Sequence, residues 1–200
     1  MARIAVLVSG GGTNLQALLD DPVVGRQIVL VVSDRVEARA LRRATDASVP
    51  TMVIEPAGFD GREGFDAALA EVLEEERIDL VVLAGFMRVL GSEFVSSFAG
   101  RIVNVHPALL PSFPGAHGVR DALDYGVKVT GVTVHLVDEG VDTGPIIAQE
   151  AVIVRDDDTR EALEERIHEV EHRLLPLAVR AAAEGRITLD GRTVRIKEES

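Results

Sequence analysis

An asparagine and a histidine stand two residues apart at the end of the apolar stretch 102–106, directly before Pro107. Alternate residues of a β-strand share a face, so the side chains of Asn104 and His106 should point the same way. Pro107 holds His106 in an extended conformation and ends the strand there. An amide donor beside an imidazole can stabilise a developing oxyanion, and the imidazole can also donate a proton. The spacing therefore predicts a catalytic pair, although two residues that only hydrogen bond at a strand end would share this pattern.

An acidic residue, Asp142, lies in the turn-rich stretch 138–145, which follows an apolar run containing His135. An acid in a loop is most often a cap or a solvated charge. If the fold brought Asp142 close to His106, its carboxylate could keep the imidazole protonated and accept a proton from an attacking amine. The sequence pattern by itself leaves both interpretations open.

A glycine-rich loop, Ser9-Gly10-Gly11-Gly12-Thr13-Asn14, joins the first apolar run to the first predicted helix. Glycine lets the backbone approach a ligand closely, and a helix N-terminus offers free N–H groups and the positive end of the helix dipole. The loop matches neither the dinucleotide motif G-x-G-x-x-G nor the Walker motif. It favours a site for a phosphate group, with a plain tight turn as the alternative.

A possible metal motif occurs late in the chain, where His168 and His172 flank the sequence His-Glu-Val-Glu-His. This matches H-x-x-E-H, a zinc-peptidase signature, and the two histidines would lie one helical turn apart. Only 28 residues follow His172 in the 200-residue chain. Their acids, such as Glu184 and Asp190, lie beyond a predicted bend or in a predicted hairpin, so we expect no metal site.

The elements that must position these residues are strands and helices in alternation, which is the signature of a parallel α/β sheet. After Pro107 two strands follow each other with no long helix between them. We therefore expect a Rossmann-like, mostly parallel sheet with helices on both faces and an antiparallel C-terminal part. The expected strands are 4–8, 28–32, 51–54, 80–83, 102–105, 128–137 and 146–154, and the expected helices are 14–19, 37–47, 62–76 and 119–125.

A last, long helix is predicted between Asp158 and Gly185. Asp158 as N-cap and Glu161 resemble a capping box, Pro176 should bend the helix, and Gly185 should end it. An apolar stripe on one face is formed by Leu163, Ile167, Val170, Leu174 and Leu177. A hairpin is expected in the tail, residues 186–200, around Asp190-Gly191. We find no linker, and one domain over residues 1–200 is the simplest organisation.

Composition restricts the classes of partner. A chain of 200 residues with 46% hydrophobic residues can bury one substantial core. The formal net charge of -12 argues against nucleic acid, whose phosphates require a basic face. No apolar run is long enough to span a membrane, and no signal peptide is recognisable. The absence of cysteine excludes disulfides and thiolate nucleophiles and fits a cytoplasmic protein.

Several motifs together resemble the formyltransferases that use 10-formyltetrahydrofolate. These are Leu83–Leu90, Asn104–Pro111, the run His135-Leu136-Val137 and the stretch Asp142–Ile146, found in the family's order. The first loop and Glu171-His172 are similar to the phosphoribosylglycinamide formyltransferase branch. The resemblance covers about residues 2–185. It implies a phosphate-binding half over 1–107 and a folate-binding and catalytic half over 108–185.

The resemblance also implies roles for individual residues. Asn104, His106 and Asp142 would be the catalytic trio. Glycinamide ribonucleotide would be held by Gly12, Thr13, Asn14, His168 and Glu171. Arg88 would face the glutamate tail of the folate. The folate would be held by Arg62, Met87, Arg88, Val89, Leu90, Asn104, Asp138, Glu139, Gly140, Val141 and Asp142. At Ser112, relatives often carry a basic residue.

The implied reaction is direct formyl transfer in purine biosynthesis, from 10-formyltetrahydrofolate to the amine of glycinamide ribonucleotide. The implied partners are these small molecules, with no metal, nucleic acid or membrane, and with a monomer or homodimer as the assembly. Three alternatives remain. A 10-formyltetrahydrofolate hydrolase would share the trio but carry an N-terminal regulatory domain. Methionyl-tRNA formyltransferase would carry a C-terminal RNA-binding domain, and a non-catalytic binding module would not need the trio.

Overall fold

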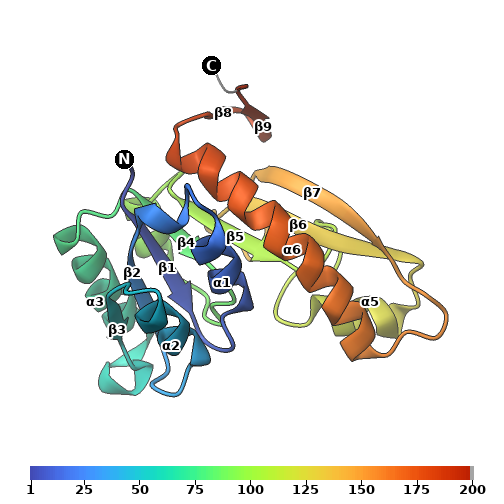
Figure 1. Ribbon diagram of the computed structural model, residues 1–200, viewed down its shortest axis with the longest axis horizontal. Helices are drawn as coiled ribbons and strands as arrows, with labels where there is room; N and C mark the ends of the chain where they lie inside the picture. Colours follow the sequence, from blue (N-terminus) through green and yellow to red (C-terminus); the bar gives the residue numbers. More distant parts are fainter. Residues whose placement is uncertain (199–200) are drawn as a thin grey trace.

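The computed structural model describes residues 1–198. A twisted sheet runs through the molecule, with helices packed on both of its faces (Figure 1). The strands of this sheet are β1 (Ile4–Val8), β2 (Ile28–Ser33), β3 (Thr51–Val53), β4 (Leu80–Leu83), β5 (Ile102–His106), β6 (Val129–Leu136) and β7 (Ile146–Ile153). The helices are α1 (Thr13–Asp20), α2 (Arg39–Asp46), α3 (Gly61–Glu75), α4 (Ser92–Ser97), α5 (Gly118–Tyr125) and α6 (Arg160–Ala183), with short 3-10 turns at Gly25–Gln27 and Pro56–Gly58.

The strand order is β3-β2-β1-β4-β5-β6-β7. All neighbours from β3 to β5 are parallel, whereas β6 pairs antiparallel with β5 and with β7. The predicted fold class is confirmed. The chain first builds outward from β1 to β3 and then returns to place β4 on the other side of β1. In open α/β sheets, ligands bind beyond the carboxyl ends of the strands at such a reversal.

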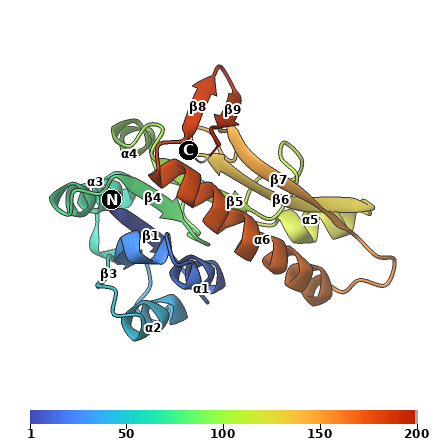
Figure 2. The same cartoon turned by 45° about the horizontal axis from the view of Figure 1, so that its top comes forward.

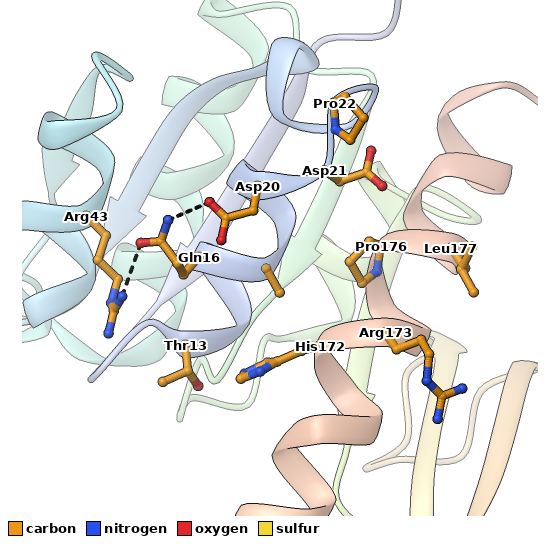
Figure 3. A pocket seen from close by; sticks show the side chains of 11 residues that line it. Thr13, Gln16, Asp20, Asp21, Pro22, Arg43, His172, Arg173, Pro176 and Leu177 are labelled. Atoms are coloured by element: carbon orange, nitrogen blue, oxygen red, sulfur yellow. Dashed lines mark hydrogen bonds between the residues drawn. The ribbon is translucent and has the colours of Figure 1, made fainter.

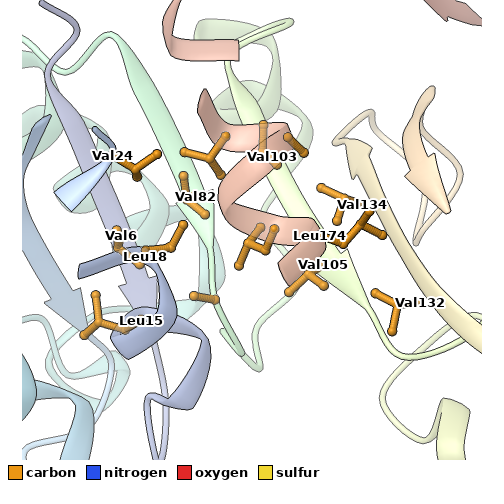
Figure 4. Packing of buried hydrophobic residues seen from close by; sticks show 14 of the residues in the cluster. Val6, Leu15, Leu18, Val24, Val82, Val103, Val105, Val132, Val134 and Leu174 are labelled. Carbon is orange, nitrogen blue, oxygen red and sulfur yellow. The ribbon is translucent and has the colours of Figure 1, made fainter. Parts of the chain in front are cut away.

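Two apolar cores cover the two faces of the sheet. Along β1, Ile4, Val6 and Val8 face one core, while Ala5 and Leu7 face the other, as the two-residue period of a strand requires. The first core takes in α1, α2, α5 and α6, and the second takes in α3 and α4. Figure 4 shows valines of the central strands packed against leucines of α1 and α6. Each such fully buried side chain contributes about 1.5–3 kcal/mol.

The long helix α6 lies across the sheet and joins its two halves (Figures 1 and 2). It continues through Pro176, which is buried. Four members of the predicted apolar stripe, Leu163, Ile167, Val170 and Leu174, are buried in the first core. Leu177 is 58% exposed, so its place in the stripe was wrong. An α-helix has about 3.6 residues per turn, so positions counted in steps of three and four drift around its surface, and position 177 no longer faces the core. Leu175 and Ala178 face the sheet instead.

The start of α6 also differs from the prediction. The N-cap is Thr159, whose side chain accepts a hydrogen bond of 3.2 Å from the N–H of Ala162. Asp158 instead accepts from the N–H of Arg155 and forms an ion pair with Arg166. Aspartate and threonine are both good N-caps. Because Arg166 engages the Asp158 carboxylate, Thr159 takes the N-cap position. Helix α4, which follows the segment 84–91, was not predicted.

The C-terminal strands β8 (Ile187–Asp190) and β9 (Thr193–Ile196) form a separate two-stranded antiparallel sheet. It stands beside the end of α6 and the edge of β7 (Figure 2). Gly185, with φ 65°, follows the end of α6 in the left-handed conformation that ends many helices. Within residues 1–198, no helix is long and apolar enough to cross a membrane.

Candidate active site

A cleft of about 220 Å³ opens at the carboxyl ends of β4 and β5 and is also lined by His135 of β6 and the loop that follows β6. Asn104 and His106 of β5 line it, as does Asp142 from the loop after β6. The strand period therefore placed the pair on one face, as predicted. The turn-rich stretch 138–145 brings Asp142 to the same place, which sequence spacing alone could not establish. Asp142 adopts φ 54°, a left-handed conformation that aspartate tolerates better than most residues.

The carboxylate of Asp142 joins the predicted trio. Its Oδ2 lies 3.3 Å from Nδ1 of His106, and its Oδ1 accepts a hydrogen bond of 3.3 Å from the Asn104 amide. The backbone N–H of Gly115 donates a further hydrogen bond of 2.7 Å to Oδ2. The three side chains thus form one connected group at the floor of the cleft.

A fourth side chain, His135, belongs to the same group. It lies opposite Asn104 across the antiparallel pair of β5 and β6. Its Nε2 is 3.2 Å from the Asn104 amide nitrogen and 3.5 Å from Oδ1 of Asp142. Its Nδ1 lies 2.8 Å from the Leu136 carbonyl and donates to it, because a carbonyl oxygen can only accept. In the sequence, His135 stands out only within an apolar run and a family motif, because the register that places it opposite Asn104 is set by the pairing of β5 with β6.

Burial and hydrogen bonding set the charges in this group. Burial holds the pKa of His106 below its ordinary value, while the Asp142 carboxylate and the Phe113 carbonyl partly oppose that effect. Burial also disfavours the charged form of Asp142, but hydrogen bonds from His135 and Gly115 outweigh it, so the pKa of this carboxyl is lowered. Asp142 is therefore ionised at neutral pH. The ionised Asp142 carboxylate favours the protonated form of His106, as expected, whereas burial of the ring disfavours it.

The segment 113–118 closes over His106. Nε2 of the ring donates to the carbonyl of Phe113 at 2.7 Å. A Cβ at Gly118 would lie 3.2 Å from the same ring nitrogen, a tight contact, so a glycine here lets the start of α5 approach the imidazole without displacing it. The donors of His106 and Asn104 therefore all have partners within the protein before any ligand arrives.

The glycine loop after β1 lies beside this group. Gly12 adopts φ 73°, and a Cβ there would lie 2.6 Å from Cβ of Ala40. A Cβ at Gly10 or Gly11 would meet nothing within 4 Å, so this part of the loop has an open flank. The N-terminus of α1 follows directly, as the predicted phosphate site requires.

Two predicted nucleotide-binding residues meet although 157 positions separate them. The amide of Asn14 donates a hydrogen bond of 3.0 Å to Oε2 of Glu171, and both side chains are buried. Burial raises the pKa of Glu171, and the Asn14 hydrogen bond and the nearby His168 oppose the shift. Oδ1 of Asn14 is buried with no hydrogen-bond partner. The neighbouring Thr13 does not join this pair and instead lines a separate hollow between α1 and α6.

A second cleft of about 200 Å³ contains Asn14, His168 and Glu171. Two cations that sequence analysis missed, Arg120 and Arg160, also line it. It shares five lining residues with the cleft around Asn104 and His106, so the two clefts are continuous at Gly85, Met87, Val105, Pro107 and Ala116. Ser9 links the two halves, because its hydroxyl accepts from the N–H of Met87 at 2.9 Å.

Most of the predicted folate residues line the first cleft, namely Met87–Leu90, Asn104, Asp138 and Gly140–Asp142. Arg62 and Glu139 are not among its lining residues. Arg62 comes from the first turn of α3, and Glu139 is exposed in the loop after β6. Arg88 is half-buried, with its guanidinium 5.0 Å above the Phe65 ring.

A third hollow, open to solvent, lies between α1 and α6 and is shown in Figure 3. Arg43 lines it and donates to the carbonyl of Gly11 at 2.9 Å and to Gln16 at 3.1 Å. Gln16 in turn donates to Asp20. This network braces the glycine loop from outside. His172 also lines the hollow, and its ring stacks on His168 with centroids 6.0 Å apart. The described residues contain no group of three potential metal ligands.

Comparisons with known proteins agree with this geometry. A family profile described as "Formyl transferase" matches residues 2–179. The chain is 53% identical over 194 residues to phosphoribosylglycinamide formyltransferase of Mycobacterium tuberculosis, covering 96% of this chain and 90% of the relative. It is 46% identical over 203 residues to the trifunctional purine biosynthetic protein adenosine-3 of Homo sapiens, covering 99% of this chain and 20% of that protein.

Solved structures give the same result. The crystal structure of glycinamide ribonucleotide transformylase 1 from Symbiobacterium toebii superposes with a TM-score of 0.95 at 51% sequence identity, covering 99% of this chain and 95% of that one. Phosphoribosylglycinamide formyltransferase from Streptococcus pneumoniae gives a TM-score of 0.85 at 47% identity, covering 90% of this chain and 98% of that one.

Proposed function

The chain belongs to the formyl transferase family, and on this basis we propose that it transfers the formyl group of 10-formyltetrahydrofolate to the amine of glycinamide ribonucleotide. The products are formylglycinamide ribonucleotide and tetrahydrofolate, a step of purine biosynthesis in the cytoplasm. The relatives named phosphoribosylglycinamide formyltransferase support this choice of substrates.

One observation carries the proposal. Two continuous clefts meet beside a group in which Asp142 contacts both His106 and Asn104. One cleft lies next to the helix N-terminus that suits a phosphate, and the other is flanked by the largely apolar segment Met87–Leu90. Reaction between two bound ligands requires them to be held in contact at the reacting atoms, and this arrangement supplies that contact.

The nucleotide would occupy the cleft of Asn14, His168 and Glu171. Backbone N–H groups after Gly12 would bind its phosphate, with Thr13 at the first turn of α1. The unpartnered Oδ1 of Asn14 and the buried carboxyl of Glu171 offer acceptors for hydroxyl or amine hydrogens. Arg120 and Arg160 add positive charge to a protein that is otherwise strongly acidic.

The folate would occupy the cleft of Asn104 and His106. Met87 and Val89 present exposed apolar side chains for its ring system and aryl group, and the loop 138–142 supplies polar backbone. Arg62 and Arg88 lie on the side from which a glutamate tail would leave, and a guanidinium pairs well with carboxylates. Arg62 and Glu139 would act at the rim of the cleft.

The chemical step needs a bond to form and a bond to break at the formyl carbon. The amine nitrogen bonds to this carbon, the bond from the carbon to N10 breaks, and one proton passes from the amine to N10. Asn104 and His106 stabilise the negative oxygen of the tetrahedral stage, for which their donors turn from the Phe113 carbonyl, His135 and Asp142 to the substrate. Asp142, which supports the positive charge on His106, accepts the amine proton, while His106 donates a proton to N10 and regains one from Asp142.

A turnover assay tests the proposal. We would incubate the protein with 10-formyltetrahydrofolate, with and without glycinamide ribonucleotide, and follow the tetrahydrofolate released. Release that depends on both substrates is expected. Equal release without the ribonucleotide would identify a hydrolase, and no release in either case would exclude formyl transfer.

A further inference from the structure

One face of α3 lies beneath the segment Phe86–Gly91. Arg62, Phe65 and Asp66 share this face, because residues three and four apart on a helix are neighbours. Phe65 and Asp66 are buried, with 1% and 6% of their surface exposed. A buried carboxylate is costly unless it is paired, so the partners of Asp66 indicate what it does.

The principal partner of Asp66 is the backbone of the segment. Its Oδ2 accepts a hydrogen bond of 2.7 Å from the N–H of Gly91, the N-cap residue of α4. A Cβ at Gly91 would lie 2.9 Å from the same oxygen and 3.6 Å from Nε of Arg62. Burial raises the pKa of Asp66, and the Gly91 N–H, Arg62 and Arg88 oppose that shift by stabilising the charged form. Gly91, Arg62 and Arg88 therefore converge on one carboxylate.

Phe65 holds the other end of the segment. Its ring stacks on Phe86 with centroids 6.5 Å apart, and the Arg88 guanidinium lies 5.0 Å above it. Between these contacts the side chains alternate. Phe86 and Leu90 are buried, whereas Met87 and Val89 are 63% and 57% exposed and line the cleft. The contacts of Asp66 and Phe65 at the two ends of the segment therefore set the positions of Met87 and Val89.

We propose that Asp66 is a positioning residue for the folate subsite, which holds the Met87–Leu90 segment in place through the N–H of Gly91. The inference rests on the proposed function for the identity of the ligand. Asp66 lies outside the cleft and does not touch the reacting atoms. Its removal should therefore weaken folate binding while leaving the nucleotide subsite and the chemical step intact.

The experiment compares Asp66→Ala with Asp66→Asn and with Glu71→Ala. The asparagine oxygen can still accept from Gly91, whereas alanine cannot. Glu71→Ala removes one acidic side chain from an exposed position of the same helix and serves as the matched control. For each protein we would measure kcat, the KM of both substrates, and the Kd of unreactive tetrahydrofolate by calorimetry.

Asp66→Ala should raise the folate KM and the tetrahydrofolate Kd about tenfold, as expected when a charge-assisted hydrogen bond is lost. Its kcat and its KM for the ribonucleotide should stay within about twofold of wild type. Asp66→Asn should stay within about threefold in folate affinity, and Glu71→Ala should not change it. An unchanged Kd in Asp66→Ala, or an equal loss for both substrates, would overturn the proposal.

A second measurement does not depend on catalysis or on the ligand. The chain has three methionines, so the methyl NMR signal of Met87 is readily assigned. In Asp66→Ala this signal should shift, and that of Met52 on β3 should not. Gly91→Ala, which places a methyl group against Oδ2 of Asp66, should shift the Met87 signal too, but not when Asp66 is already alanine. An unmoved Met87 signal would contradict the inference, whereas a wild-type protein inactive with both substrates would contradict only the proposed function.

Discussion

At the scale of single residues, the position of Asp142 in the site depends on the tertiary fold more than the positions of Asn104 and His106 do. Asn104 and His106 share a face because they are two apart on β5, a relation visible in the sequence. Asp142 reaches them only because the loop after β6 turns through a left-handed residue at position 142. No local pattern reveals such a turn, which is why resemblance to a family was needed to include Asp142.

Asn104→Ala and His106→Ala test the oxyanion donors. Removing one such donor typically lowers turnover by ~10²–10³. We expect this loss in kcat, with tetrahydrofolate Kd and ribonucleotide Kd within about threefold of wild type, since neither side chain anchors the ligands alone. Steady-state kinetics and calorimetry on both variants provide the check, and near-normal turnover in either would remove that residue from the mechanism.

Glu171→Gln should separate stability from function. Burial raises the pKa of Glu171 above 4.5, so between pH 4.5 and the raised value the folded protein binds more protons than the unfolded one. Stability contributed by this group therefore falls as pH rises through that window. Glutamine keeps an acceptor for Asn14 without a charge. Denaturant titrations should show Glu171→Gln gaining stability over wild type at pH 8 and losing that advantage towards pH 4.5.

The same variant should bind the ribonucleotide more weakly, with a KM raised about tenfold or more, because a charged acceptor is replaced by a neutral one. Folate KM should not change. A Glu171→Gln protein with unchanged ribonucleotide KM would show that Glu171 is only a structural partner of Asn14.

At the scale of elements, strand and helix periodicity predicted most of the sheet. β1 and β4 begin and end where apolar runs do, because strands buried on both faces are apolar throughout. Three features escaped prediction because they depend on tertiary contacts. His135 joins the site through pairing of β6 with β5, and Thr159 caps α6 because Arg166 engages Asp158. The N-cap of α4, Gly91, is held by Asp66.

The glycine loop gives a prediction at this scale. Gly12→Ala places a Cβ 2.6 Å from Cβ of Ala40 at a residue with φ 73°. Strain of this kind costs about 1–3 kcal/mol. The variant should unfold at a lower temperature and bind the ribonucleotide more weakly, since α1 and its N–H groups must move.

Gly11→Ala is the matched control, because a Cβ there meets nothing within 4 Å and the backbone angle is ordinary. Thermal unfolding should leave Gly11→Ala close to wild type. If both variants lose the same stability, the close approach of α2 to Gly12 is not what the loop requires.

At the scale of the whole molecule, the reversal of strand order creates the site. The loops that follow the two strands at the reversal, β1 and β4, diverge from each other. These loops are the glycine loop and the segment 84–91, and they flank the opening between them. Ser9 ties these two loops together through Met87. The predicted location at the carboxyl edge thus follows from topology, whereas the side-chain contacts within it do not.

The C-terminal hairpin also reaches the site. Arg192, at the turn between β8 and β9, donates to the carbonyl of Thr143, the residue after Asp142. Arg192→Ala should lower kcat/KM for the folate about threefold, the modest size expected of an exposed contact. Arg195→Ala on the same hairpin, whose nearest acid Asp190 is 3.9 Å away, is the control. Equal kinetics in the two variants would show that the hairpin does not steady the Asp142 loop.

The central claim is that the formyl group passes directly from one bound ligand to the other beside Asn104, His106 and Asp142. The most direct test follows a ¹³C-labelled formyl group by NMR, with both substrates present in equal amounts. The label should move from N10 of the folate to the glycinamide nitrogen in full yield, with no free formate. Appearance of labelled formate in place of the formylglycinamide would contradict direct transfer.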